Sequence, residues 1–558
     1  MRSKHRVFQA VVALFLAAVA TARVFAGAAE QPRDEKYLAA VRRYADNVIA
    51  RGKDVYGEKH TPLFVDGLNV ATGQPVEWKK DGETWVLSNP ASQQNLFRVF
   101  DGLTRLTGDS KYRQAAVDAI TYAFENLRGP NGLLLWGGHI AYDARGDKMV
   151  MEQYNHELKC HYPYYPLMWE VNPEATKRFL EAFWAAHILN WSNLEMNRHG
   201  SPKKPFSNPW NNKYEGGEVF FWGTGLSFLN TGSDMYYAAA MLTKLSGEKE
   251  PLVWGKRMAH RYVETRNPKT GIGGFQFSQS RTAQCYENIR GDRAQYQYGD
   301  DFPGHLVVEG TLFPCYGDTP AVKPWMCMFL LGETLGKEGA EFTQWALEEL
   351  TAWGKAAYRA GDNSFIPMLT DGTSMEGYVC KKDGYFGPKG RVLKAGRAGA
   401  ADFWAYTLAY RVTRDPFMWE MARNIGKGND WGELPASASG EPQLPKSITS
   451  SSPELLLGFL DLYTATGKPE YLAMARTIGD NIIAQRFHQD LFAQSRKHVF
   501  AKFDAVEPLA LLHLYAVENG IRDRVPVVWP GSSYFHCPHD GVGRTYDNSV
   551  IYSKVGTD

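Results

Sequence analysis

A stretch of the 558-residue chain between residues 136 and 200 carries side chains that can bind a metal ion or move a proton. These are His139, Glu157, Arg198 and His199. Two imidazoles and one carboxylate suit a transition metal such as manganese, iron or zinc. Calcium would require more oxygen ligands, supplied by clustered Asp and Glu. The residue types favour a transition-metal site, although their spacing alone leaves a structural role open for each histidine.

One familiar zinc motif is excluded in the same stretch. His156, Glu157 and His161 resemble the H-E-x-x-H helix of zinc proteases, but the second histidine lies five positions after the first instead of four. On a helix this turns it by roughly 140° from the first. The two histidines therefore cannot share one metal ion in the way that this motif requires.

Repeated helix–turn–helix patterns predict the scaffold around these residues. Four segments combine the end of an apolar helix, a tight polar turn and the start of a second helix: 106–112, 245–248, 412–416 and 466–471. Similar segments suggest six or seven hairpins. We expect an all-α fold, an (α/α) toroid that is probably an (α/α)7 barrel, with short β segments in its loops. An open solenoid is the alternative, but its repeats would be more regular.

The first hairpin element is a predicted amphipathic helix from Lys36 to Arg51, which Gly52 would end. Its apolar face contains Leu38, Val41, Tyr44 and Val48. Between residues 271 and 313 helical periodicity is lost, and Gly274–Ser278 is predicted to be a short strand. We expect this long segment and the tail at 531–547 to lie beside the site, or else simply to cover one end of the barrel.

Composition limits the classes of function. Hydrophobic residues make up 44% and charged residues 22% of the chain, which excludes general disorder. An aromatic content of 13% is compatible with sugar stacking, although large cores use aromatics as well. The formal net charge of +1 gives no sign of a nucleic-acid-binding protein. The six cysteines form no C-x-x-C pair, and their pairing cannot be deduced from their spacing.

The N-terminus is typical of an exported protein. Arg2, Lys4 and Arg6 precede an apolar run at 11–20, and Val24-Phe25-Ala26 offers a cleavage site. We therefore expect residues 1–26 to be a signal peptide and residues 27–558 to be a single catalytic domain. A retained anchor is the alternative, but the run is too short to span a bilayer. The mature protein would be periplasmic or secreted, with no contact to the membrane.

Five segments resemble those of family 2 polysaccharide lyases. They are Trp136–His139, His156–Glu157, Arg198–His199, Gly291–Gln295 and Gly543–Asp547, and the likeness extends over most of the mature chain. Members of that family are pectate lyases with an (α/α)7 barrel. The resemblance implies cleavage of polygalacturonate or its oligomers by β-elimination.

The resemblance also implies roles for individual residues. His139, Glu157 and His199 would hold a divalent metal, for which we expect manganese first, with other transition metals or calcium as alternatives. Glu152 and His156 lie within a turn of Glu157, which leaves the middle ligand open. Arg198 would be the Brønsted base, or alternatively a clamp for a substrate carboxylate.

Arg293 and Arg544 lie in loops that are rich in Gly and Tyr, and we expect them to bind carboxylates of an acidic polysaccharide. For Arg293, a salt bridge to Asp292 or Asp300 is the alternative. A glycoside hydrolase acting on uronic or unsaturated oligosaccharides is a second functional hypothesis. It would need an acid–base pair, for which Asp300, Asp301 and Glu309 are available. A third is a non-catalytic carbohydrate-binding barrel.

Overall fold

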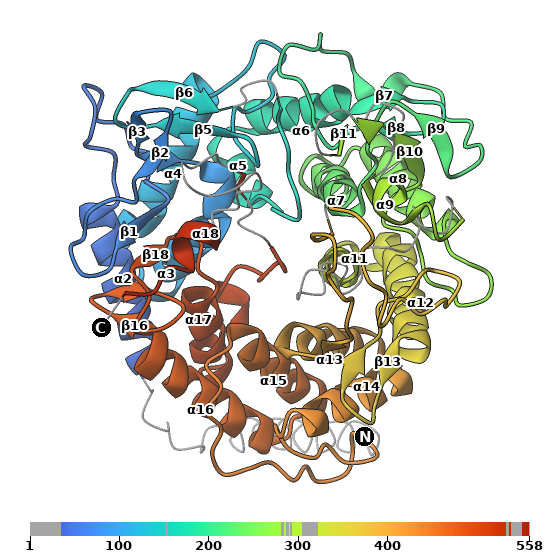
Figure 1. Ribbon diagram of the computed structural model, residues 1–558. Helices are drawn as coiled ribbons and strands as arrows, with labels where there is room; N and C mark the ends of the chain where they lie inside the picture. The colour runs from blue at the N-terminus through green and yellow to red at the C-terminus, as the bar shows by residue number, and fades with distance from the viewer. Residues whose placement is uncertain are drawn as a thin grey trace, which may run out of the picture.

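Helices arranged in two concentric layers form a closed ring (Figure 1). The computed structural model describes residues 35–151, 155–280, 284–285, 289–290, 293–303, 322–384, 386–531, 535–536 and 549–556. The inner helices in this part of the chain are α3 (Gln94–Thr107), α5 (Tyr165–Val171), α7 (Leu229–Ser246), α11 (Val322–Leu335), α13 (Ala400–Thr413), α15 (Pro453–Thr466) and α17 (Glu507–Glu518). The outer helices are α2 (Lys36–Arg51), α4 (Ser110–Asn126), α6 (Pro173–His187), α8 (Glu250–Glu264), α12 (Ala340–Ala356), α14 (Pro416–Gly428) and α16 (Pro469–Arg486).

Each inner helix packs against one outer helix. Six pairs are consecutive in the chain, from α3–α4 to α15–α16, and α17 pairs with α2 to close the ring. The described residues thus form seven helix pairs, which confirms the predicted all-α (α/α)7 toroid.

The inner helix α17 and the outer helix α2 differ in how much of their surface is buried, as their sequences suggest. In α17, ten consecutive residues from Glu507 to Ala516 are buried, as expected for a helix covered on all sides. In α2, the buried residues include Leu38, Val41, Tyr44 and Val48, and this helix has the bounds that the sequence predicts. The outer helix α2 therefore shows the single apolar stripe of a helix that is covered on one face.

Short turns join inner to outer helices at one end of the ring. Gly108, Gly247 and Gly467 follow α3, α7 and α15 with φ angles of 77°, 80° and 72°, in the left-handed region that glycine adopts without strain. Asp109 then accepts a hydrogen bond from the Lys111 N–H and caps the next helix. The repeated turns seen in the sequence are these connections.

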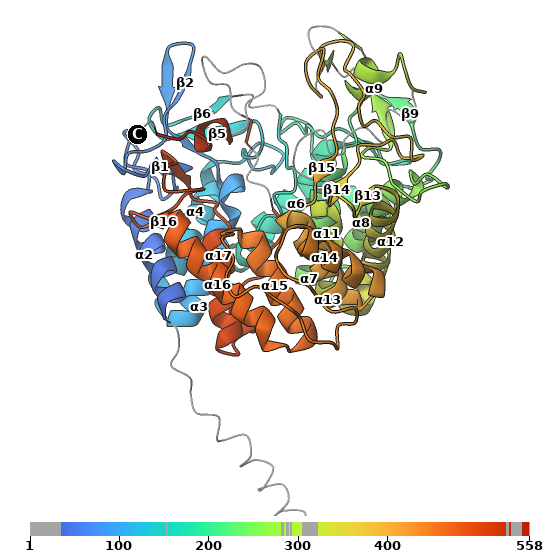
Figure 2. The same ribbon diagram turned by 60° about the horizontal axis from the view of Figure 1, so that its bottom comes forward.

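Long connections and short strands lie at the opposite end (Figure 2). The strands nearest the candidate site are β4 (Leu87–Ser88), β5 (Ile140–Asp143), β6 (Lys148–Met151), β7 (Ile188–Asn190), β8 (Glu195–Met196), β9 (Phe221–Gly223) and β10 (Ser278–Ser280). β4, β5 and β6 form an antiparallel sheet, β7 pairs with β8, and β9 runs parallel to β10.

The remaining strands are β1 (Gly67–Asn69), β2 (Trp78–Lys80), β3 (Glu83–Trp85), β11 (Gln284–Cys285), β12 (Ile289–Arg290), β13 (Tyr358–Arg359), β14 (Ser364–Phe365), β15 (Gly396–Arg397), β16 (Phe487–His488), β17 (Leu491–Phe492) and β18 (Phe500–Lys502). β1 pairs with β18, so it joins the two ends of the described chain. The short helices are η1 (Pro90–Gln93), η2 (Pro209–Asn211), α9 (Arg293–Tyr298), η3 (Gly336–Gly339), η4 (Arg522–Arg524) and α18 (Ser549–Tyr552).

Two local predictions are wrong. The strand expected at Gly274–Ser278 starts only at Ser278, and Gln276 makes an isolated bridge to Phe228. The segment at 271–313, expected to lack helix, contains α9. In both places contacts with neighbouring loops override a weak local pattern.

The predicted signal peptide, residues 1–26, lies outside the described residues. In the part of the chain that the structure describes, no helix is both long enough and apolar enough to cross a membrane. Cys160, Cys327 and Cys380 are buried free thiols.

Candidate metal and catalytic site

Backbone hydrogen bonds bring three distant segments together at the end of the ring that carries the strands. The Gly138 N–H donates to the Glu157 carbonyl oxygen at 2.7 Å. His156 and Gly200 exchange two hydrogen bonds, of 2.9 and 2.8 Å. Side chains that are separated by up to 60 positions in sequence therefore converge on one point.

Each segment is held by the element next to it. His139 directly precedes β5, and Glu157 follows β6 of the same hairpin. The outer helix α6 leads into the β7–β8 hairpin, and Arg198 and His199 follow β8. The site is thus built on connections that lead from outer to inner helices, and long connections of this kind are where functional residues tend to concentrate.

Two glycines permit this close approach. Gly137 has a φ of 109°, and a Cβ atom there would lie 2.3 Å from the Glu157 carbonyl oxygen. A Cβ atom on Gly200 would lie 2.4 Å from the His187 ring. Asn89 fixes Gly137 further, because its amide accepts from the Gly137 N–H at 3.1 Å and donates to the Gly137 carbonyl at 2.7 Å. A larger residue at either glycine would displace a ligand-bearing segment.

Behind the site, two buried histidines pack against each other. His156 Nδ1 lies 3.1 Å from His187 Nε2, and His187 Nδ1 lies 2.9 Å from the Asn197 carbonyl oxygen. Burial lowers the pKa of His187 to about 4, so the ring is neutral at pH 7. A neutral His187 donates through Nδ1 to the carbonyl, which leaves Nε2 to accept from His156. Nδ1 of His156 is therefore engaged with His187, and among the described residues His156 does not belong to the group that could hold a metal ion.

The three predicted ligands lie together. One potential ligand atom from each of His139, Glu157 and His199 lies within 4.8 Å of the others. His139 Nε2 is 3.1 Å from Glu157 Oε2, and His199 Nε2 is 3.8 Å from Glu157 Oε1. Ligands about 2.1 Å from one ion would be separated by about 3 Å. Within the described residues, His199 Nε2 is buried without a hydrogen-bond partner. The donor set and its spacing therefore fit a transition-metal ion.

The charges of the site keep these donors in the forms that bind metal. Burial alone would raise the pKa of Glu157, but the cations Arg198 and Lys159 outweigh it and hold the pKa well below its usual range. Burial, followed by the charge of Arg198, lowers the pKa of His199 well below its usual value. An ionised carboxylate and a neutral imidazole are the forms that coordinate an ion.

Arg198 lies directly against this cluster. Its Nη1 donates a 2.7 Å hydrogen bond to Glu157 Oε1, and its guanidinium lies 5.5 Å from the centroid of the Phe228 ring. The residue is 6% exposed. A guanidinium held on one side by a carboxylate and on another by a ring has a fixed position in a largely dry site.

Two neighbours of the cluster were missed from the sequence. Lys159 Nζ lies 3.3 Å from Glu157 Oε2, and the His536 ring lies 4.9 Å from the His139 ring between centroids. Lys159 lies two positions after Glu157 in an irregular segment, and its approach to the same carboxylate depends on a local conformation that the spacing does not specify. His536 lies in the tail at 531–547 that was expected beside the site, but it was not named as a site residue.

Other predicted residues lie elsewhere or cannot be placed. His161 Nδ1 accepts from the Lys159 N–H at 2.8 Å and is not part of the ligand cluster. Arg293 is the first residue of α9, and the structure describes its backbone but not its side chain. Arg544 and Glu152, the other acidic candidate for the middle ligand, lie outside the described residues.

The acids named for a hydrolase are engaged by lysines. Asp300 lies 2.9 Å from Lys382 Nζ, and Asp301 is bonded to Lys381 and Tyr378. Those bonds from Lys381 and Tyr378 lower the pKa of Asp301. It is therefore not prepared to act as a general acid at neutral pH. Glu309 lies outside the described residues.

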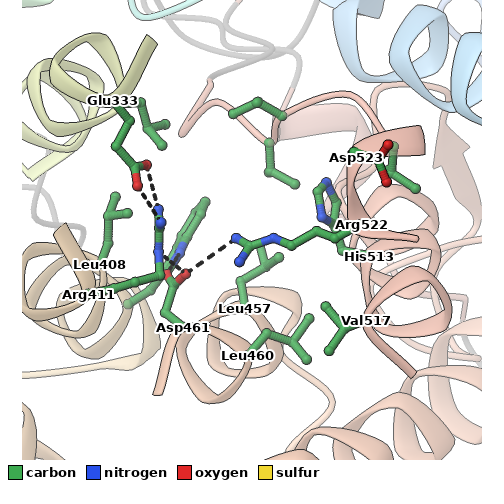
Figure 3. A pocket seen from close by; sticks show the side chains of 15 residues that line it. Glu333, Leu408, Arg411, Leu457, Leu460, Asp461, His513, Val517, Arg522 and Asp523 are labelled. Carbon is green, nitrogen blue, oxygen red and sulfur yellow. Dashed lines mark hydrogen bonds and ion pairs between the residues drawn. The ribbon is translucent and has the colours of Figure 1, made fainter. Parts of the chain in front are cut away.

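A cavity of about 430 Å³ lies between inner helices, toward the ends that carry the short turns (Figure 3). Arg411 lies between Glu333 and Asp461, with distances of 2.5 and 2.6 Å, and Arg522 approaches the same Asp461 at 3.9 Å. These four charged side chains of the cavity thus pair with one another, and most of the other residues that line the cavity are aliphatic. None of the site residues lines it, so the metal cluster remains the candidate site.

The chain is similar to a known family, to a curated relative and to several solved structures. The family described as "Periplasmic pectate lyase" matches residues 61–538. The pectate disaccharide-lyase of Dickeya dadantii (strain 3937) is 29% identical over 550 residues, covering 93% of this chain and 96% of that protein. Among solved structures, a D-mannose isomerase is 13% identical, with a TM-score of 0.42, and covers 80% of this chain and 97% of its own. The cellobiose 2-epimerase from Bacillus thermoamylovorans B4167 is 10% identical, also with a TM-score of 0.42, and covers 87% of this chain and 100% of its own.

Proposed function

The chain belongs to the periplasmic pectate lyase family and is a polysaccharide lyase, and from this premise we propose that it is a metal-dependent pectate lyase that uses Arg198 as its Brønsted base. Its substrate would be polygalacturonate or its oligomers. The observation that carries this proposal is the convergence of His139, Glu157 and His199 on one point with Arg198 in direct contact.

The reaction is a β-elimination. The C5–H bond breaks and its proton goes to the base, a C4–C5 double bond forms, and the C4–O bond breaks. The departing sugar keeps that oxygen, which takes up a proton from water. The C5 proton is only weakly acidic, because it is α to a carboxylate. A divalent cation held by His139, Glu157 and His199 would stabilise the charge that develops on that carboxylate.

Arg198 must be neutral to accept the proton, and an arginine side chain has a pKa above about 12 in water. Two features of the site favour the neutral form. The side chain is removed from water, and Lys159 adds a second positive charge on the other oxygen of Glu157. If Glu157 also coordinated a metal ion, its negative charge would no longer fully compensate the positive charge of Arg198. The alternative, in which Arg198 clamps a substrate carboxylate, would need another base.

Other parts of the proposal concern binding and location. We place Arg293 and Arg544 on substrate carboxylates along the cleft, because a polyuronate carries one carboxylate per sugar. Residues 1–26 would be a signal peptide and residues 27–558 a single exported catalytic domain. The periplasmic description of the family supports export. Manganese is the proposed ion, because the N,O,N donor set suits a first-row transition metal.

The direct test follows the ultraviolet absorbance of the new double bond during incubation with polygalacturonate. We expect the absorbance to rise, to stop rising after chelator treatment, and to recover with Mn²⁺. New reducing ends without absorbance would show hydrolysis and overturn the proposal. Binding without turnover would instead favour the non-catalytic barrel.

A further inference from the structure

Glu157 lies between two cations, one on each carboxylate oxygen. Arg198 Nη1 is 2.7 Å from Oε1, and Lys159 Nζ is 3.3 Å from Oε2. The side chains of Glu157, Arg198 and Lys159 are 0%, 7% and 11% exposed. These charges interact with little screening from water.

A divalent ion changes the charge balance of this group. Without the ion, one buried carboxylate faces two cations. An ion held by His139, Glu157 and His199 would add two positive charges beside the carboxylate that Lys159 and Arg198 contact. Uncompensated buried charge is costly, so the loaded site requires further anions. A polyuronate provides them as carboxylates.

Lys159 is suited to respond to this change. An ammonium on a flexible four-carbon stem can move from one carboxylate to another with little rearrangement of the backbone. Its Nζ also lies on the same oxygen as His139, which is 3.1 Å from Oε2, so an ion on this side would displace it.

We propose that Lys159 is a substrate-binding residue: it pairs with Glu157 in the structure and would contact a uronate carboxylate when the site holds an ion and substrate. This inference rests on the proposed function. As a result, metal and substrate should bind with positive coupling, since each relieves the charge imbalance that the other meets.

The test compares wild-type protein with Lys159→Met, which keeps the stem and removes the charge. Calorimetric titration with Mn²⁺ should give a higher affinity for the variant, by about 10-fold, because a competing cation is gone. Titration of the Mn²⁺-loaded proteins with D-galacturonate, which has no glycosidic bond to break, should give an affinity at least about 10-fold lower for the variant. D-Galactose, which has no carboxylate, should show no such difference.

Controls separate this role from simple support of Glu157. If Lys159 only holds Glu157 in place, Lys159→Met would weaken Mn²⁺ binding and leave galacturonate affinity unchanged, which would overturn the inference. Lys159→Arg keeps a cation and should retain galacturonate binding, so a loss there would also count against it. Lys177→Met removes another lysine–glutamate pair, between Lys177 on the outer helix α6 and Glu248 in the turn that joins α7 to α8, and should change neither affinity.

Failure of the proposed function would look different. Wild-type protein that generates no absorbance from polygalacturonate would sink the lyase proposal and this inference with it. Normal wild-type turnover, combined with equal galacturonate affinities in the wild type and Lys159→Met, would overturn the role of Lys159 alone.

Discussion

Arg198 Nη1 donates a 2.7 Å hydrogen bond to Glu157 Oε1, so the proposed base and a proposed metal ligand are directly hydrogen-bonded. In the proposed mechanism this contact would link acid–base chemistry to occupancy of the metal site. An ion on Glu157 would weaken the contact that favours the protonated guanidinium. The base would therefore become available only in the loaded enzyme.

Replacing Arg198 tests its role as base. Arg198→Ala should lower turnover of polygalacturonate by about 10²- to 10⁴-fold, the usual contribution of a general base. Mn²⁺ content at saturating Mn²⁺ should stay the same, because the three ligands remain. Arg257→Ala, at a half-buried arginine over the Trp254 ring, serves as the control and should keep normal activity. Near-normal rates in Arg198→Ala would refute the assignment.

Replacing a ligand tests the metal site without reference to activity. His139→Ala should reduce Mn²⁺ affinity by more than about 10-fold, the lower end of what loss of an outer-shell partner alone costs. Equilibrium dialysis against Mn²⁺ measures this directly. His260→Ala, on the exposed side of α8, is the matched control. Equal Mn²⁺ binding by both variants would show that the ion, if any, binds elsewhere.

Gly137→Ala should disturb both folding and metal binding. The new Cβ atom would lie 2.3 Å from the Glu157 carbonyl oxygen, in addition to the strain of a φ of 109°. Gly217→Ala separates the two effects, because Gly217 has a φ of 99° but no atom within 4 Å of the point where the new methyl group would lie. Strain alone costs about 1–2 kcal/mol. We expect urea unfolding to show that loss for Gly217→Ala, and a larger loss together with weaker Mn²⁺ binding for Gly137→Ala. Equal losses of stability and equal Mn²⁺ binding in the two variants would argue against a steric clash between the new Cβ atom at position 137 and the Glu157 carbonyl oxygen.

Asp234 makes stability depend on pH. Its carboxylate accepts the N–H groups of His161 and Tyr162 at 3.0 and 2.8 Å, and burial raises its pKa to about 7. The pKa of Asp234 is higher in the folded than in the unfolded protein. The free energy of unfolding therefore falls as the pH rises toward 7. Asp234→Asn, which keeps an acceptor oxygen, should gain about 2–3 kcal/mol relative to wild type between pH 5 and pH 8.

Unfolding curves of both proteins at pH 5 and pH 8 provide the measurement. The difference between their free energies of unfolding should change with pH in favour of Asp234→Asn at pH 8. A difference independent of pH would mean that Asp234 has an ordinary pKa in the folded protein.

The scaffold was predictable because its signals are local. The apolar stripe of Lys36–Arg51 and the glycine turn at Gly467 lie within single helices or between consecutive ones. Each of these two features depends on residues that are close to one another in the sequence. The bounds of the strand near Ser278 could not be predicted, since its partner β9 comes from a separate loop.

The site was predictable only in part. The resemblance supplied His139, Glu157, Arg198 and His199, and the structure brings these four together, while their roles stay predictions. Their contacts depend on backbone pairing between segments such as 156 and 200, which spacing does not reveal. Lys159 was not predicted, because it lies in an irregular segment whose conformation is not specified by a helical spacing.

Closure of the ring by α2 and α17 affects how this chain can fold. The Tyr44 hydroxyl donates to the Phe503 carbonyl oxygen at 2.7 Å, across a separation of 459 positions. Contacts at such separations form late, because a long loop must close first. Until that step, the first and last helices each expose an apolar face that has no neighbour. A nascent chain is therefore expected to need protection from aggregation until its last helix is available, and loss of any one hairpin would leave two open faces where the closed ring has none.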